Sequence, residues 1–269
     1  MHAFKLWGRH PGETVYIIGT GPSQRLFPLD FLADKTTIGL NQAWKHLNCT
    51  YSITVHPEHV WDYGHADDPK NATEWIVTSL KKRSAVRHKP IPTEEFPDRK
   101  KKIDVWYSAQ HCEHYVFDPA YGAGALHDPA LLAAGGSDNR LYQAHGVHNS
   151  AMWCAARMGA SFIVLVGCDM TDLGAEHHAH EQHVRWCGAD PSKAYKEYRL
   201  DAADTRRVLR ERAGVRVMTM TPFMGCGHAE EDYARQKREQ NLPDLPEPKD
   251  ISPYRRPDLG RLDEKLKGN

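Results

Sequence analysis

Short apolar runs separated by turn residues recur along the chain and dominate its hydrophobic pattern. Each run is too short for a typical helix, and most are rich in β-branched residues. This pattern is typical of strands buried on both faces of a parallel sheet. The predicted strands are residues 14–18, 36–40, 51–55, 74–78, 103–107, 161–166 and 215–219.

Helical patterns alternate with these runs. Residues 149–158 place apolar side chains at helical spacing, and Gly159 follows as a C-terminal cap. Residues 194–213 form a charged helical stretch that ends at Gly214, and 26–32 predict a short helix. Strands alternating with helices predict a Rossmann-like α/β fold, a mostly parallel sheet with helices on both faces.

The remaining segments define the expected domain organisation. Residues 1–228 are predicted to form one Rossmann-like domain. Within it, 108–145 fit no long period and are interpreted as an insertion, and the histidine-rich 171–198 as a lid. Residues 229–269 contain five prolines, ten acidic and nine basic residues, which predicts an extended or partly disordered tail.

Composition narrows the class of protein. Lys plus Arg and Asp plus Glu are both 35 in 269 residues, which argues against a whole-chain polyanion binder. No apolar run is long enough to span a membrane, and no secretory leader is expected. Six cysteines without a C-x-x-C pair indicate a reducing, cytoplasmic setting. Lys81 to Lys102 carry nine basic and three acidic residues. They form either a solvated loop or a patch that attracts an anionic acceptor, nucleic acid included.

Ligands in such folds bind beyond the carboxyl ends of the strands, so the loops there are the first candidates. Gly19-Thr20-Gly21-Pro22-Ser23 follows the first strand. Its glycines let backbone N–H groups approach an anion, and Ser23 offers a hydroxyl. The turn lacks the third glycine of a dinucleotide fingerprint and the Gly-Lys-Ser/Thr of a P-loop. It is either a phosphate-binding turn or a plain strand-to-helix turn.

Two further stretches offer polar groups at strand or helix ends. Asn41 and Gln42 follow the second strand and can bind a base edge or a sugar hydroxyl, or Asn41 caps a helix. Residues 146–150 open the helix before the central strand. Asn149 or Ser150 caps that helix there, with or without a ligand at its N–H groups.

Asp169 ends the central strand in Gly167-Cys168-Asp169. Its carboxylate is placed to bind a ribose hydroxyl, a metal ion or a substrate hydroxyl, or it accepts loop N–H bonds in a structural role. Farther on, His180 and His183 share a helical face within a histidine-rich stretch. These histidines either bind a metal ion, or are exposed to solvent, or face the substrate. The Pro-Cys-x-x-Cys motif that accompanies such histidines in zinc deaminases is missing.

Together these stretches resemble two related families. The ordered set is 15–23, Asn41-Gln42, the helix start at 146–150, 163–169 and Met220-Thr221-Pro222. It is similar to the bacterial lipooligosaccharide sialyltransferases, which use a cytidine-monophosphate donor, and to the 6-hydroxymethylpterin diphosphokinase-like proteins. The resemblance spans about residues 14–222, with large gaps between 60 and 140.

The resemblance implies a nucleotide donor bound by a single Rossmann-like domain. Each matching stretch receives an expected role. Gly19, Thr20, Gly21, Pro22 and Ser23 lie near the donor phosphate, Asn41 and Gln42 face the phosphate or the transferred group, His148, Asn149 and Ser150 line the nucleotide pocket, and Thr221 and Pro222 lie near the base. Tyr195 and Tyr198 correspond to family tyrosines that donate to the leaving phosphate.

One departure concerns the general base. Sialyltransferases of this kind carry a catalytic histidine before the helix that precedes the last strand, whereas 193–204 contain none. His180 and His183 are the nearest substitutes. The leading hypothesis is a glycosyltransferase that moves a sugar from a nucleotide-sugar donor to a hydroxyl acceptor. The alternatives are a Mg²⁺-dependent diphosphotransferase acting on a pterin-like alcohol, with Asp169 as metal ligand, and a phage-like, non-catalytic nucleotide-binding accessory protein.

Overall fold

The computed structural model of the chain describes residues 1–21, 23, 24, 27–56, 59, 60, 63, 73–78, 114–132, 136–170 and 191–220, with the backbone alone for residues 123 and 191–196. Within these residues the chain forms an eight-stranded sheet in which all neighbouring strands are parallel. This arrangement confirms the predicted Rossmann-like α/β fold.

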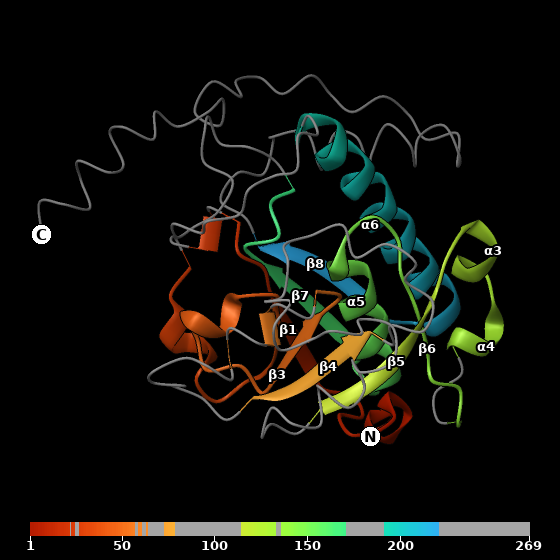
Figure 1. Cartoon of the computed structure of the whole chain (residues 1–269), viewed down its shortest axis with the longest axis horizontal. Helices are drawn as coiled ribbons and strands as arrows, with labels where there is room; N and C mark the ends of the chain where they lie inside the picture. The colour runs from red at the N-terminus through yellow and green to blue at the C-terminus, as the bar shows by residue number, and fades with distance from the viewer. Residues whose placement is uncertain are drawn as a thin grey trace, which may run out of the picture.

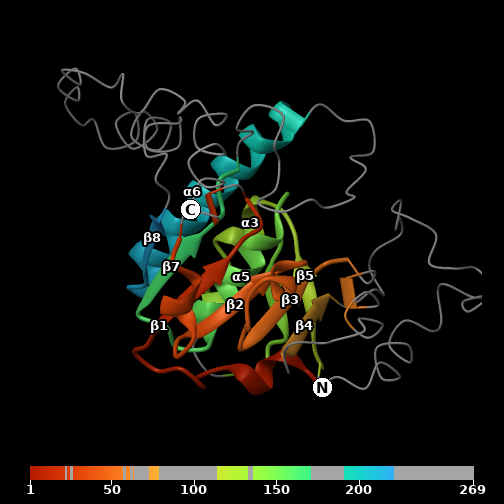
Figure 2. The same cartoon turned by 90° about the vertical axis from the view of Figure 1, so that its left-hand side faces the viewer.

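The strand order shows where the chain changes its direction of travel across the sheet. From β1 the chain moves outward strand by strand to β6, and then returns to lay β7 against the other side of β1 (Figure 2). The spatial order is β6-β5-β4-β3-β2-β1-β7-β8. The strands are β1 (Thr14–Ile18), β2 (Thr36–Leu40), β3 (Tyr51–Thr54), β4 (Glu74–Thr78), β5 (His114–Ala120), β6 (Arg140–Tyr142), β7 (Phe162–Val166) and β8 (Arg216–Met220).

The two long helices lie on the same face of the sheet and pack against each other (Figure 1). They are α5 (Val147–Arg157) and α6 (Pro191–Ala213). The shorter helices with described bounds are η1 (Ala3–Leu6), η3 (Leu29–Leu32), η4 (Ala43–Lys45), α3 (Ala123–Leu126) and α4 (Pro129–Leu132). None of the helices in these residues combines the length and apolarity needed to cross a bilayer.

Adjacent residues of a strand supply the two core layers, because side chains alternate between the faces of a sheet. In β1, Ile17 packs into the large layer beneath α5, whereas Ile18 packs with Leu32 of η3 on the opposite face. Both isoleucines are fully buried. Helical elements therefore cover both faces, as predicted, although on the second face the described ones are short 3₁₀ helices.

The region interpreted as an insertion, 108–145, instead contains two strands of the sheet, β5 and β6. The apolar run of β5 is only three residues long, because His114 and Asp118 bound Tyr115, Val116 and Phe117. In the predicted lid, 191–198 form the start of α6. The predicted strand 103–107, the rest of the lid and the tail from 229 onward lie outside the described residues.

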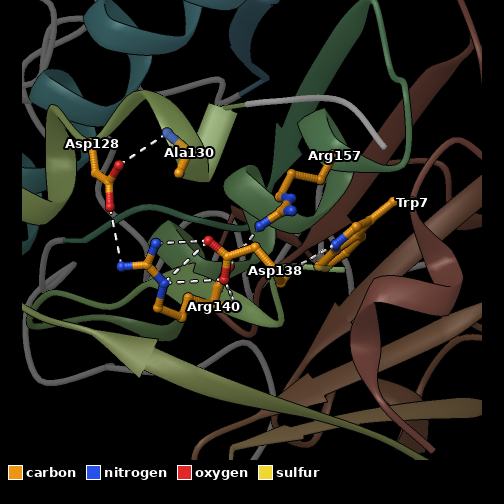
Figure 3. Close-up of polar contacts among 6 residues, drawn as sticks. All are labelled: Trp7, Asp128, Ala130, Asp138, Arg140 and Arg157. Atoms are coloured by element: carbon orange, nitrogen blue, oxygen red, sulfur yellow. Dashed lines mark hydrogen bonds and ion pairs between the residues drawn. The ribbon is translucent and has the colours of Figure 1, made fainter. Parts of the chain in front are cut away.

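A buried cation, Arg157, joins the end of α5 to the N-terminal segment (Figure 3). Only 1% of Arg157 is exposed. Its guanidinium carbon lies 4.5 Å from the ring centroid of Trp7, and Nη1 donates to the Arg140 carbonyl at 3.0 Å. Among the described residues the Nε and Nη2 donors have no hydrogen-bond partner, and burial lowers the pKa of Arg157. Packing on Trp7 therefore accounts for more of its contribution to stability than hydrogen bonding does.

We expect the free energy of unfolding of Arg157→Met to lie within about 1 kcal/mol of the native value. Methionine keeps the contact with Trp7 and removes the buried unpaired donors. Arg157→Ala should lose about 3 kcal/mol, because it leaves a cavity beside the ring. Urea unfolding measures both. An equal loss in the two variants would show that the positive charge, rather than the packing, is what the fold needs.

Candidate functional site

The candidate site lies at the carboxyl ends of β1 and β7, where the strand order reverses. The loops that follow these strands run side by side. The Gly19 N–H donates to the Val166 carbonyl at 2.7 Å, and the Gly21 N–H donates to the Gly167 carbonyl at 2.7 Å. In open α/β sheets this topological switch point is where ligands bind. The predicted motifs of both loops thus share one edge of the sheet.

Asp169 closes the end of these two loops by binding Ser23. The Ser23 N–H donates to Asp169 Oδ2 at 2.7 Å, and the Ser23 hydroxyl donates to Oδ1. Both residues are almost fully buried. An internal carboxylate therefore occupies the anion-binding donors of Ser23. Of the two roles predicted for Asp169, ligand binding and a structural contact, this geometry corresponds to the structural contact.

Two glycines of the first loop allow this close approach. A Cβ on Gly19 would lie 2.3 Å from the Gly167 carbonyl oxygen, and one on Gly21 would lie 2.6 Å from Asp169 Oδ2. Real Cβ atoms do not approach other atoms so closely, so both positions need glycine to hold the loops together. Between them Thr20 is partly exposed.

In the second loop, burial raises the pKa of the Cys168 thiol to about 12, so it remains a thiol at neutral pH.

Asn41 adds an amide at the end of β2. Its backbone is left-handed, with φ of 52°, a conformation that asparagine tolerates better than most residues. Its Oδ1 accepts a hydrogen bond from Thr54 Oγ1 at 3.0 Å. Both Asn41 and Gln42 are partly exposed at the predicted edge.

The start of α5 is buried in the protein interior. Asn149 and Ser150 are fully buried, and His148 is 5% exposed. Asn149 Oδ1 accepts from Thr205 Oγ1 of α6 at 3.1 Å, while Ser150 Oγ donates to the Tyr142 carbonyl at 2.9 Å. The described contacts of Asn149 and Ser150 thus hold α5 against α6 and β6.

The structure also brings together a group that the sequence motifs do not contain. His145 precedes α5, and its Nδ1 lies 2.5 Å from Asp201 Oδ2 on α6. Its Nε2 lies 3.5 Å from Glu197 Oε2, one helical turn earlier on α6. The carboxylates are spaced i and i+4, which a sequence shows. The histidine that they face is separated from Asp201 by 56 residues, and no local pattern reveals that pairing.

The other predicted residues have different outcomes. Tyr198 packs edge-on against His148, with ring centroids 6.0 Å apart, and burial raises the pKa of its phenol. Tyr195 lies in α6, where only its backbone is described. The predicted residues outside the described part are Pro22, His180, His183, Thr221, Pro222 and the basic segment 81–102.

Among the described residues no cluster of three His, Cys, Asp or Glu side chains could hold a metal ion. Comparison of the chain with family models, curated proteins and solved structures finds no match.

Proposed function

We propose that this chain is a glycosyltransferase that takes a sugar from a nucleotide-linked donor and transfers it to a hydroxyl acceptor. One observation carries the proposal. The loops 19–24, 41–42 and 167–170 follow β1, β2 and β7, which are neighbours in the sheet. The motifs that resemble a nucleotide-donor site therefore share one edge at the topological switch point.

The partly exposed groups at this edge suit a nucleotide sugar. Thr20 and the Gly21 backbone lie at the turn, and the amides of Asn41 and Gln42 lie beside it. Amides supply both donors and acceptors, which sugar hydroxyls and base edges require. Because Asp169 engages both donors of Ser23, we assign donor binding to the partly exposed groups rather than to Ser23. Asp169 thereby has a hydrogen-bonding role at this edge that requires no cation.

Binding of nucleotide donors tests the proposal. CMP-, UDP- and GDP-linked sugars, with the free nucleotides, are screened by thermal unfolding of the full chain. A ligand that binds the folded state alone, at 100 times its Kd, stabilises the protein by about 2.7 kcal/mol. We expect at least one donor to raise the melting temperature and to release its nucleotide on incubation with the chain.

The matched variants are Asn41→Gly and Asp34→Asn. Glycine keeps the left-handed backbone at position 41 and removes the side chain, including the amide that accepts from Thr54. We expect it to weaken donor binding about tenfold, equivalent to about 1.4 kcal/mol. Asp34 is an exposed residue that pairs with its neighbour Lys35, so its substitution should leave binding unchanged. If none of the donors shifts the melting temperature of the native chain, the proposal is wrong.

A further inference from the structure

A carboxylate orients the imidazole of His145, as in many enzymes that use histidine as a general base. Asp201 Oδ2 lies 2.5 Å from its Nδ1 and also accepts the backbone N–H of His145 at 3.2 Å. One carboxylate therefore orients both the loop and the ring. In the tautomer that carries its proton on Nδ1, the proton is donated to Asp201, and Nε2 has the lone pair that can take a proton from a substrate.

Two carboxylates flank the imidazole of His145. The carboxylate of Glu197 lies 3.5 Å from Nε2, and Asp201 lies on the other side of the ring. Both carboxylates come from α6, and each faces one ring nitrogen of His145. The His145 side chain is 55% exposed, so a substrate hydroxyl can reach it. A loop that served only to hold α5 would need the backbone bond to Asp201 and not the imidazole.

His145 follows β6, so it lies at the same carboxyl edge of the parallel sheet as the switch point, and α6 contacts the chain at both places. Glu197 and Asp201 contact His145, while Arg199, between them in sequence, donates from Nη1 to the Met170 carbonyl at 3.2 Å. Residues 197 to 201 span about 6 Å of helix. One turn of α6 therefore contacts both His145 and the residue that follows Asp169.

We propose that His145 is the catalytic base of the transfer reaction and that Asp201 is its positioning residue; this inference rests on the proposed function. His145 Nε2 takes the proton of the acceptor hydroxyl. The hydroxyl oxygen forms a bond to the anomeric carbon of the donor sugar, and the bond from that carbon to the phosphate oxygen breaks. The bonding electrons leave with the nucleotide phosphate, and the proton stays on the imidazolium until solvent removes it.

The test measures nucleotide release from the donor identified in the binding screen, with water as the acceptor. We expect His145→Gln to lower kcat by about 10²- to 10⁴-fold, with the donor-induced melting shift unchanged. Asp201→Asn should lower kcat by about tenfold and leave KM within about twofold, because its amide oxygen still accepts the Nδ1 proton without the negative charge. His127→Gln is the matched control, since His127 is exposed and its described hydrogen bonds are made by its backbone.

Chemical rescue separates catalysis from a structural role. In His145→Ala, added imidazole should restore part of the lost rate, which a loop that had merely shifted would not allow. If a donor binds and His145→Gln turns it over at the native rate, or imidazole restores nothing to His145→Ala, the assignment of His145 is wrong while the proposed function stands. If no donor binds, or a bound donor is not turned over, both proposals are wrong.

Discussion

Replacing Gly19 by alanine should destabilise the protein by about 3 kcal/mol, because the added methyl group has no space at the switch point. Its Cβ would lie 2.3 Å from the Gly167 carbonyl oxygen and 2.9 Å from Cys168 Sγ. The first of these contacts is with backbone, which moves only if the loop after β7 moves. The Gly19 N–H bond to the Val166 carbonyl at 2.7 Å would then weaken as well.

Gly124→Ala is the matched control for this substitution. Gly124 lies in α3, and a Cβ there meets no atom within 4 Å. Alanine should leave stability unchanged or raise it by about 0.5 kcal/mol, because glycine is the poorer helix former. Urea unfolding of both variants measures the difference. If Gly19→Ala were as stable as the native chain, the two loops could separate without cost, and the prediction would be wrong.

Removing the carboxylate of Asp169 should produce a loss of similar size. Asp169→Ala leaves the buried Ser23 N–H and hydroxyl without their acceptor, and a hydrogen bond to a charged group contributes about 1.5–3 kcal/mol. We expect a total loss of about 3 kcal/mol. Asp169→Asn should lose about 1 kcal/mol, because the amide keeps hydrogen-bonding capacity toward Ser23 but loses the assistance of the charge.

A double-mutant cycle isolates the part of this interaction that passes through the hydroxyl. Ser23→Ala removes the Oγ bond and keeps the backbone bond, so Ser23→Ala and Asp169→Ala should couple by about 1–2 kcal/mol in urea unfolding. Asp34→Asn is the control for loss of a carboxylate, since Asp34 is an exposed residue on the surface. If the effects of the two substitutions on the free energy of unfolding were strictly additive, the Ser23 hydroxyl would contribute nothing to the interaction with Asp169.

Much of the sheet was predictable from the sequence because its strands are continuous apolar runs. The strands 14–18, 36–40 and 74–78 have the predicted bounds. The strands β5 and β6 were not recognised for a physical reason. In His114–Ala120 only Tyr115, Val116 and Phe117 are consecutive apolar residues, and His114 and Asp118 bound them, so the apolar run is short. Arg140–Tyr142 is too short to carry any period.

The candidate site was predictable in its position but not in its contacts. Gly21, Asn41 and Asp169 were expected at the carboxyl ends of strands, and they lie there. What Asp169 does at that edge depends on Ser23, which lies 146 residues away in the chain. The same limit applies to His145. Its sequence neighbours identify a helix start, while its two carboxylate contacts come from α6.

By itself the sequence determined the fold class, the strands that form apolar runs and the edge at which the motifs meet. These properties follow from local features, namely the periodicity of apolar residues, the turn residues and the alternation of strands with helices. Only the tertiary structure decided that Asp169 closes the loop at Ser23 and that Asp201 orients His145. The strand order lays β7 against β1 and brings α6 beside the start of α5, so contacts between distant residues depend on topology rather than on any local pattern.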